Sequence, residues 1–413
     1  MPRFWPLLTA RLRSLNAPLI SFITRLSQHL QGSKHFVSEG RRAITLIFNP
    51  INSHHFRELP MENDVLDRYD LDNNTLFIRE ENILQLAHSL HYLQNVWFTL
   101  SGEVLSLTEM DRRVAIASEA LRQQERVARI ASTWKSLQNV IQLDVIQRFM
   151  LLIMQSEPHV ADTSYSCEAD RLQHELTTVL LLPWLIELAR NPQKICLLPT
   201  LSSCQAYSRW FSSTLSEYQP QENDISYMMS LLLGGFGIVA PTTATVRFIA
   251  STKNSLNYAL IGALCAAGPA HLGACQRVTT LLSSLGDTLE QSVSAAAEVY
   301  CANRPWPGFG HPVMPRDTRV DAFFEHYTHG FGKYQALSEH ISAQSGVNPN
   351  VDYLIGSACS RWHVAPEVAV LVFFVCRVPI LLGHYRLRYH THSFGMSSSE
   401  LRDKYKALPK HWL

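Results

Sequence analysis

Charge of either sign is scarce in this sequence. Asp, Glu, Lys and Arg together make up 17% of the 413 residues, and the formal net charge is +1. A net charge so close to zero excludes the strongly basic footprint of a nucleic-acid-binding protein. Because 46% of the residues are apolar, the scarcity of charge predicts long buried helices or a large subunit interface.

The eight cysteines lack the spacing of a metal site or a redox pair. They are dispersed and include no Cys-x-x-Cys pair, which predicts buried free thiols in a reducing compartment. Paired histidines such as His88 and His91 have metal-like spacing, but no carboxylate or thiol completes the set. We therefore expect no metal site.

Acidic residues are absent from the first 38 positions. The basic residues of this apolar segment are Arg3, Arg11, Arg13, Arg25 and Lys34. Organellar transit peptides, amphipathic surface helices and family-specific extensions all share this pattern, so organelle targeting stays open. Short apolar runs interrupted by arginine argue against a secretory signal. We treat residues 1–40 as a basic N-terminal extension and expect a cytoplasmic protein.

Two long runs contain no charged residue, 225–246 and 254–276. Both are long enough to cross a bilayer. The first contains three glycines and a proline, and the second contains Pro269 and His271. Polar and helix-breaking residues inside a span are uncommon, so we expect buried helices of a globular protein and no membrane span.

Helical periodicity dominates the chain after a short β-rich start. β-branched and aromatic pieces at 43–48 and 75–78 predict a small N-terminal β element. Ser106 and Glu109 have the spacing of a capping box. The predicted helices are 107–130, 131–156, 168–190, 204–217, 224–238, 242–253, 255–267, 272–300, 318–345, 350–362 and 365–388. The expected fold class is therefore mainly α.

Residues 304–319 form the most unusual stretch. Four prolines and two glycines exclude a regular helix or central strand. The sequence predicts a stiff loop that presents His311, followed by Arg316 and Arg319. An imidazole beside guanidinium groups suits a carbonyl and a carboxylate on one small molecule. A proline-rich surface turn with a capping histidine explains the same residues.

Two further motifs lie at fitting distances along the chain from the glycines and histidine of this loop. Gly-Phe-Gly-His at 308–311 resembles a signature of the citrate synthase family. Gly-Pro-Ala-His-Leu-Gly-Ala at 268–274 resembles its Gly-Pro-Leu-His-Gly-Gly-Ala, and Pro-Asn-Val-Asp-Tyr at 349–353 resembles its Pro-Asn-Val-Asp-Phe. Three motifs in one order, about 40 residues apart, are far more specific than any one of them. The resemblance covers roughly residues 65–390.

The resemblance implies an architecture. Members of this family are mainly helical, two-lobed homodimers whose catalytic residues line the cleft between the lobes. On this pattern, residues 41–271 and 358–413 are expected to form the large lobe. Residues 272–357 are expected to form the small lobe.

The resemblance also implies a reaction, the Claisen condensation of an acyl-CoA such as acetyl-CoA with a 2-oxo acid. By motif, Asp352 is the expected base, His271 the donor to the thioester oxygen and His311 the donor to the keto carbonyl. A helix N-terminus at His271 would keep its imidazole neutral, and desolvation would make Asp352 more basic. Taken singly, a helix-capping Asp, a core His and a turn His are the ordinary alternatives.

The resemblance assigns binding roles to further residues. Arg319 and Arg377 match the family arginines that hold carboxylates. Arg386 and Arg388 are the nearest substitutes for a later arginine that is not recognisable. Arg304, Gly308 and Gly310 are the expected contacts with CoA, which is a co-substrate, and no tightly bound cofactor is expected.

One departure from the family pattern bears on the substrate. Glycine replaces both histidines of the family's His-Ala-Asp-His motif, and Gly237 stands where the oxaloacetate-binding histidine is expected. This loss predicts a different or bulkier 2-oxo acid than oxaloacetate, although the glycines also offer backbone N–H groups to an anion. Two alternatives stay open: reverse cleavage of the citryl-CoA lyase type, and a non-catalytic homologue that binds a metabolite.

Overall fold

The computed structural model describes most of the chain from residue 66 onward. The residues outside the description are 1–65, 138–141, 157–164, 166, 194–196, 217, 219–220, 286–292, 295–296, 300–305, 328–329, 392–398, 400–401, 404–405 and 407–413. The predicted strand at 43–48, the basic extension and Arg304 therefore lie outside the described residues.

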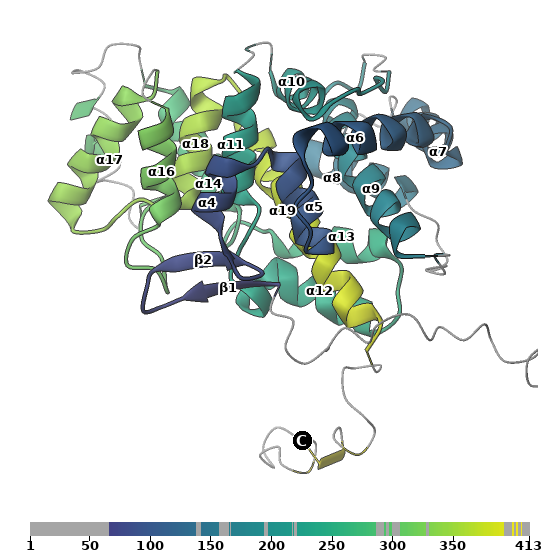
Figure 1. The fold of residues 1–413 in the computed structure, drawn as a ribbon. Helices are drawn as coiled ribbons and strands as arrows, with labels where there is room; N and C mark the ends of the chain where they lie inside the picture. The colour runs from purple at the N-terminus through teal and green to yellow at the C-terminus, as the bar shows by residue number, and fades with distance from the viewer. Residues whose placement is uncertain are drawn as a thin grey trace, which may run out of the picture. The chain divides into compact units, whose positions relative to one another are not determined.

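The chain enters its described part through a small antiparallel sheet in the order β1-β2-β3 (Figure 1). β1 (Asp67–Asp70) pairs with β2 (Thr75–Ile78), and β3 (Glu81–Asn82) pairs with the other edge of β2. The carboxylate of Asp70 accepts hydrogen bonds from the next backbone amides and so closes the hairpin turn. The predicted β element is present at 75–78.

Helices make up the rest of the fold, which confirms the predicted mainly α class. Their bounds are α4 (Ile83–Ser89), α5 (Tyr92–Ser101), α6 (Leu107–Arg122), α7 (Glu125–Leu137), α8 (Val145–Ser156), α9 (Glu168–Arg190), α10 (Cys204–Leu215), α11 (Glu222–Leu232), η2 (Gly237–Val239), α12 (Pro241–Ser251), α13 (Leu256–Ala266), α14 (Gly273–Ser283), α16 (Thr318–His326), α17 (Gly332–Ser345), α18 (Val351–Arg361) and α19 (Pro366–Tyr389).

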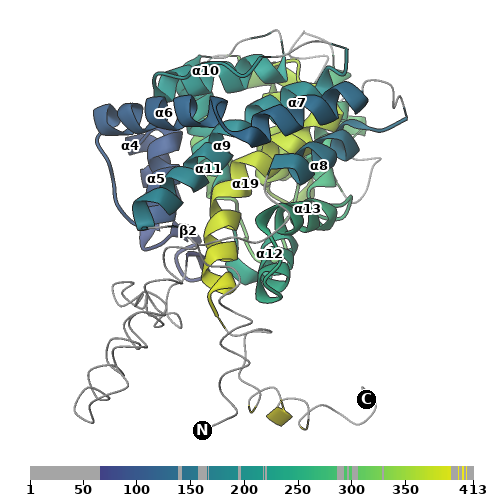
Figure 2. The same cartoon turned by 90° about the vertical axis from the view of Figure 1, so that its right-hand side faces the viewer.

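The long helix α19 is the centre of the packing. It contacts α5, α9, α12, α13, α14 and α18, and Figure 2 shows α5 on one side of it and α12 and α13 on the other. Among the described residues, α19 is the one helix long and apolar enough to span a membrane, but 94% of its most apolar window is buried inside the protein. Its apolar surface therefore belongs to the core of the helical fold.

Neither of the two charge-free runs forms a single helix. The first is divided into α11, the short turn η2 and α12, which begins at Pro241. The second is divided between α13 and α14 by a turn around residues 268–272. Glycine and proline at the break within each run keep its helices far below the length of a bilayer span.

Some predicted boundaries are wrong. The pattern over 318–345 is two helices, α16 and α17, because Gly330 has a left-handed φ of +85° between them. The helix predicted for 131–156 begins later, at α8, where Asp144 and Gln147 bond each other's backbone amides reciprocally. The side chain of Ser106 does cap α6.

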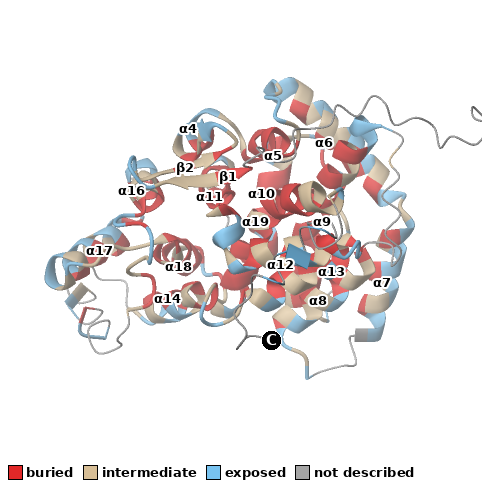
Figure 3. Ribbon diagram, turned by 90° about the horizontal axis from the view of Figure 1, so that it is seen from below, coloured by how far each residue is buried: buried red, intermediate tan, exposed pale blue. Residues whose placement is uncertain are grey.

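Helices α14, α16, α17 and α18 gather on one side of Figure 3, with their buried faces turned towards each other and towards α19. α14 packs closely on α18, and both contact α19. α18 also packs on α16. All the expected catalytic residues lie on or next to this group, whose separation as a small lobe stays a prediction.

Candidate active site

The loop that carries His311 is held against the segment before α18. The N–H of Gly310 donates to the carbonyl oxygen of Asn348 at 2.8 Å, and the N–H of Asn350 donates to the carbonyl oxygen of Gly308 at 2.8 Å. The side-chain amide of Asn350 donates to the carbonyl oxygen of Gly310 at 2.6 Å. This short ladder brings two sequence motifs, 40 residues apart, into one site.

Both glycines of the loop are required by geometry. Gly308 and Gly310 have φ values of +78° and +77°, which strain any other residue. A Cβ atom at Gly308 would also lie 2.7 Å from the side chain of Val278 and 3.0 Å from the backbone of Tyr353. These glycines hold the loop in place, and their predicted contact with CoA stays a prediction.

His311 is fixed as a hydrogen-bond donor. Its Nδ1 atom accepts hydrogen bonds from the backbone N–H groups of Val313 and Met314 at 3.1 and 3.0 Å, which leaves the proton on Nε2. The ring of Phe236 stacks on the imidazole with 4.7 Å between centroids. Burial, and then the charge of Arg319, lower the pKa of His311, so the ring is a neutral donor at pH 7.

His271 lies in the tight turn that leads into α14. Its backbone N–H donates to the carbonyl oxygen of Gly268 at 2.9 Å, two residues before α14 begins. Burial, and then the charge of Arg377, lower the pKa of His271 to about 4. The imidazole is therefore neutral at pH 7, as the sequence predicts, although burial and a neighbouring guanidinium are the causes rather than the helix dipole.

Asp352 is the second residue of α18, two positions after the helix-capping Asn350, whose side chain accepts its backbone N–H. The residue is only half-buried, yet its Oδ1 atom is closed off from solvent and has no hydrogen-bond partner. Burial raises the pKa of Asp352 to about 7, against the opposing charge of Arg319. A carboxylate in this state is poised to exchange a proton near neutral pH.

Arg319 is the first of the two arginines that are expected to hold a carboxylate. Its guanidinium makes a double hydrogen bond to the carboxylate of Asp317 at 2.8 and 2.7 Å, and both side chains are fully buried. The same carboxylate accepts the backbone N–H of Val351 at 2.9 Å, at the start of α18. The Nη1 atom of Arg319 is buried without a partner, which is the pattern of a site waiting for an anionic ligand.

Arg377, from the middle of α19, is the second arginine that is expected to hold a carboxylate. A side chain at position 235 would overlap its Nη1 atom, so only Gly235 leaves room for this guanidinium. Its Nε atom is buried without a partner. Burial, and then the charge of Arg319, lower the pKa of Arg377 to about 10, so the guanidinium of Arg377 remains cationic at pH 7.

The glycine-rich segment before α12 does bind an anion, but the anion is the protein's own. The backbone N–H of Gly235 donates to Oδ2 of Asp67 at 2.8 Å, and Nε2 of His384 donates to Oδ1 at 2.7 Å. A Cβ atom at Gly237 would lie 3.0 Å from the carbonyl oxygen of Asp67. The space next to position 237, where the family has a histidine, is therefore filled by Asp67 and is not a void.

Arg386 and Arg388 lie in a different group of side chains. Arg386 donates to the carboxylate of Glu175 at 3.2 Å, and Arg171 binds the same carboxylate at 2.6 Å. Arg388 donates to the hydroxyl of Thr391 at 3.2 Å. The structure thus unites His271, His311, Asp352, Arg319 and Arg377 through shared electrostatic influence, and it places Arg386 and Arg388 apart.

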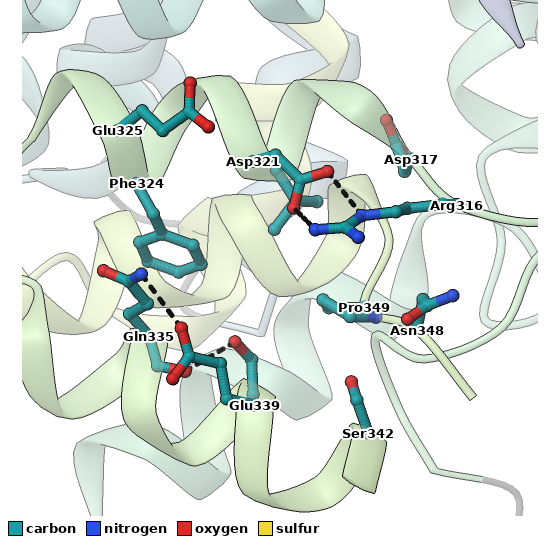
Figure 4. A pocket seen from close by; sticks show the side chains of 12 residues that line it. Arg316, Asp317, Asp321, Phe324, Glu325, Gln335, Glu339, Ser342, Asn348 and Pro349 are labelled. Carbon is teal, nitrogen blue, oxygen red and sulfur yellow. Dashed lines mark hydrogen bonds and ion pairs between the residues drawn. The ribbon is translucent and has the colours of Figure 1, made fainter. Parts of the chain in front are cut away.

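A cavity of about 330 Å³ adjoins the site between α16 and α17 (Figure 4). It borders Asp317 and the segment of Asn348 and Pro349. Figure 4 shows the double hydrogen bond between Arg316 and Asp321 on its wall, at 2.7 and 2.8 Å. No group of three or more His, Cys, Asp or Glu side chains suited to a metal ion occurs among the described residues.

Comparison with known proteins identifies related sequences and folds. Residues 61–393 match the family described as citrate synthase, C-terminal domain. A 173-residue stretch is 29% identical to 2-methylcitrate synthase 2 of Corynebacterium glutamicum and covers 38% of this chain and 44% of that relative. The chain thus spans less than half the length of the curated relative that it matches.

Solved citrate synthases share the fold. That of Thermotoga maritima superimposes with a TM-score of 0.58 at 20% identity, covering 78% of this chain and 87% of the other. That of the archaeon Thermoplasma acidophilum, a ternary complex with carboxymethyl coenzyme A and oxaloacetate, gives a TM-score of 0.59 at 15% identity, covering 80% and 91%. At these identities the likeness establishes the helical architecture.

Proposed function

Because the chain belongs to the citrate synthase family, we propose that it condenses an acyl-CoA, in the simplest case acetyl-CoA, with a 2-oxo acid. The observation that carries this proposal is the carboxylate of Asp352. Its Oδ1 atom is buried without a partner and its pKa is raised to about 7. His311 has Arg319 and Asp317 as charged neighbours in common with Asp352, and His271 is influenced by Arg377, as is His311.

In the first step Asp352 removes a proton from the α-carbon of the acyl group. The electron pair of that C–H bond moves towards the thioester oxygen, which becomes enolic. His271 donates a hydrogen bond to this oxygen. Since the pKa of His271 is about 4, the ring stabilises the developing charge as a neutral donor.

In the second step the enolic carbon attacks the keto carbon of the 2-oxo acid, and a C–C bond forms. The Nε2–H of His311 donates to the keto oxygen as it becomes an alkoxide, because Nδ1 is already occupied by two backbone amides. Arg319 and Arg377 offer their unpartnered N–H groups to the carboxylate of the acid. This contact orients the keto carbon towards the enol.

In the last step water attacks the thioester carbonyl and the C–S bond breaks. CoA leaves as a free thiol, and the alkoxide takes up one proton, which balances the proton that Asp352 removed from the acyl group. The product is a 2-hydroxy acid that carries one additional carboxylate. The 2-oxo acid is proposed to differ from oxaloacetate, since glycine stands at position 237 and the neighbouring space is filled by Asp67.

We further propose that the protein acts as a homodimer. Ile238 and Val239 of η2 and Phe248 of α12 are 63%, 75% and 74% exposed. Large apolar side chains exposed on adjoining elements favour a subunit interface. Sedimentation of the purified chain at micromolar concentration tests this, and a monomer under these conditions contradicts it.

Thiol release from acetyl-CoA against a panel of 2-oxo acids tests the proposed reaction. We expect release with at least one acid. The Asp352→Asn variant is expected to lower the rate by about 10²–10⁴-fold, the contribution of a general base. Asp321→Asn, a carboxylate change on nearby α16, should leave the rate unchanged.

Silence across the panel, or full activity of Asp352→Asn, contradicts the proposal. Release of thiol from a citryl-CoA thioester without net condensation would instead support the lyase direction, because the same residues serve the reverse reaction. Product analysis by mass spectrometry separates these two outcomes.

A further inference from the structure

Asp67 is a buried carboxylate that the proposed reaction does not use. It is the first residue of β1 and is 3% exposed. Its two oxygens accept hydrogen bonds from the N–H of Gly235 at 2.8 Å and from Nε2 of His384 at 2.7 Å. The backbone N–H of Gly237 provides a further hydrogen bond. An anion is thus built into the glycine-rich segment.

The charge of Asp67 is retained in this position. Burial alone would raise its pKa, but the hydrogen bond and charge of His384, the amide of Gly237 and the charge of Arg377 together lower it. Nη1 of Arg247 lies 3.4 Å from Nδ1 of His384, and this arrangement keeps the imidazole proton on the nitrogen that faces Asp67.

The neighbouring guanidinium groups have few donors left. Among the donor atoms of Arg319 and Arg377, Nη1 of Arg319 and Nε of Arg377 are buried without a partner. Arg319 influences Arg377 electrostatically. One free donor on each guanidinium suits the two oxygens of one carboxylate.

Asp67 lies beside Arg377 as well as beside the glycine amides. A Cβ atom added at Gly235 would overlap Nη1 of Arg377 and would lie 3.4 Å from Oδ2 of Asp67. The negative charge of Asp67 therefore offsets part of the positive charge of this guanidinium. Without Asp67, this flank of Arg377 would be more positive and would better suit a second carboxylate.

We propose that Asp67 is a specificity-determining residue that restricts the site to 2-oxo acids with a single carboxylate and an uncharged second end. The inference rests on the proposed function, since it names the class of 2-oxo acid that the site takes. Asp67 acts in two ways. Its carboxylate accepts the hydrogen bonds of the backbone amides that a second carboxylate would need, and its negative charge lies beside Arg377 and repels a second carboxylate there.

Binding of two matched acids tests this inference. 2-Oxobutyrate and oxaloacetate share a four-carbon skeleton and differ in a methyl group or a carboxylate at C4. Isothermal titration calorimetry on the full chain is expected to give a dissociation constant at least tenfold lower for 2-oxobutyrate, equivalent to about 1.4 kcal/mol. Asp67→Asn is expected to shift this ratio at least tenfold towards oxaloacetate, whereas Asp72→Asn, on the same hairpin, leaves it unchanged.

The outcomes separate this inference from the proposed function. If the wild type binds oxaloacetate as tightly as 2-oxobutyrate, or more tightly, the proposed role of Asp67 is wrong. The same holds if Asp67→Asn loses affinity for both acids equally. Neither result contradicts the proposed condensation. If neither acid binds and no thiol is released, the proposed function fails together with the inference. If Asp67→Asn does not fold, the dissociation constants of the wild type for the five-carbon pair 2-oxovalerate and 2-oxoglutarate are compared instead. Tighter binding of 2-oxovalerate supports the inference, and equal or tighter binding of 2-oxoglutarate overturns it.

Discussion

Two Arg–Asp pairs at the start of α16 provide an internal test of how burial determines the value of an ion pair. Arg319 binds Asp317, and Arg316 binds Asp321, each through two hydrogen bonds of 2.7–2.8 Å. The first pair is fully buried, whereas the side chains of the second are 62% and 33% exposed. Geometry is therefore matched and solvent access differs.

Removing the carboxylate charge from each pair should lower the free energy of unfolding by very different amounts. Asp317→Asn leaves the guanidinium of Arg319 buried without a counter-charge, which lowers the free energy of unfolding by about 3–5 kcal/mol. Asp321→Asn leaves Arg316 solvated, and the loss is at most about 1 kcal/mol. Urea unfolding followed by circular dichroism measures both changes, with the slope m checked for constancy.

The comparison has a clear refuting result. If the two variants lose stability to within about 1 kcal/mol of each other, burial does not govern these pairs and the reasoning is wrong. A lower slope m in Asp317→Asn alone would show instead that the variant no longer unfolds as one unit.

Three further outcomes are expected. Because burial raises the pKa of Asp352 to about 7 and the base acts only when ionised, kcat/KM for thiol release should rise about tenfold per pH unit below 7 and level off above it; a flat profile from pH 5.5 to 8.5 contradicts this role. Gly308→Ala should lose at least about 1 kcal/mol more stability than Gly346→Ala in urea unfolding, since both have positive φ but only Gly308 has atoms in the way; equal losses contradict the steric argument. Asp144→Ala should lower the free energy of unfolding by about 1 kcal/mol through the lost cap of α8, and an unchanged urea midpoint contradicts it.

The sequence was sufficient for those parts of the site that lie within local motifs. His271, His311 and Asp352 each sit in a short run of glycine, proline or asparagine whose conformation is determined by near neighbours. In the structure the three residues are linked through neighbouring guanidiniums: Arg377 acts on His271 and His311, and Arg319 acts on His311 and Asp352. The capping signal at Asp144 was also present in the sequence, as an Asp followed three residues later by Gln.

Contacts between distant segments could not be predicted in the same way. Asp67 lies 168 residues from Gly235 and 317 residues from His384, and no periodicity or motif links such positions. The stacking of Phe236 on His311 is equally non-local. The glycines of this segment did indicate an anion, but only the tertiary structure shows that the anion belongs to β1.

Asp317 links Asp352, the proposed base, to Arg319, the proposed carboxylate-binding residue. Its carboxylate holds the guanidinium of Arg319 and, through the N–H of Val351, the first turn of α18 that carries Asp352. The negative charge of Asp317 also raises the pKa of Asp352, while that of Arg319 lowers it. A ligand carboxylate that binds Arg319 weakens the stabilising effect of this guanidinium on ionised Asp352. Under the proposed function, binding of the 2-oxo acid is therefore coupled, through one ion pair, to the basicity of Asp352.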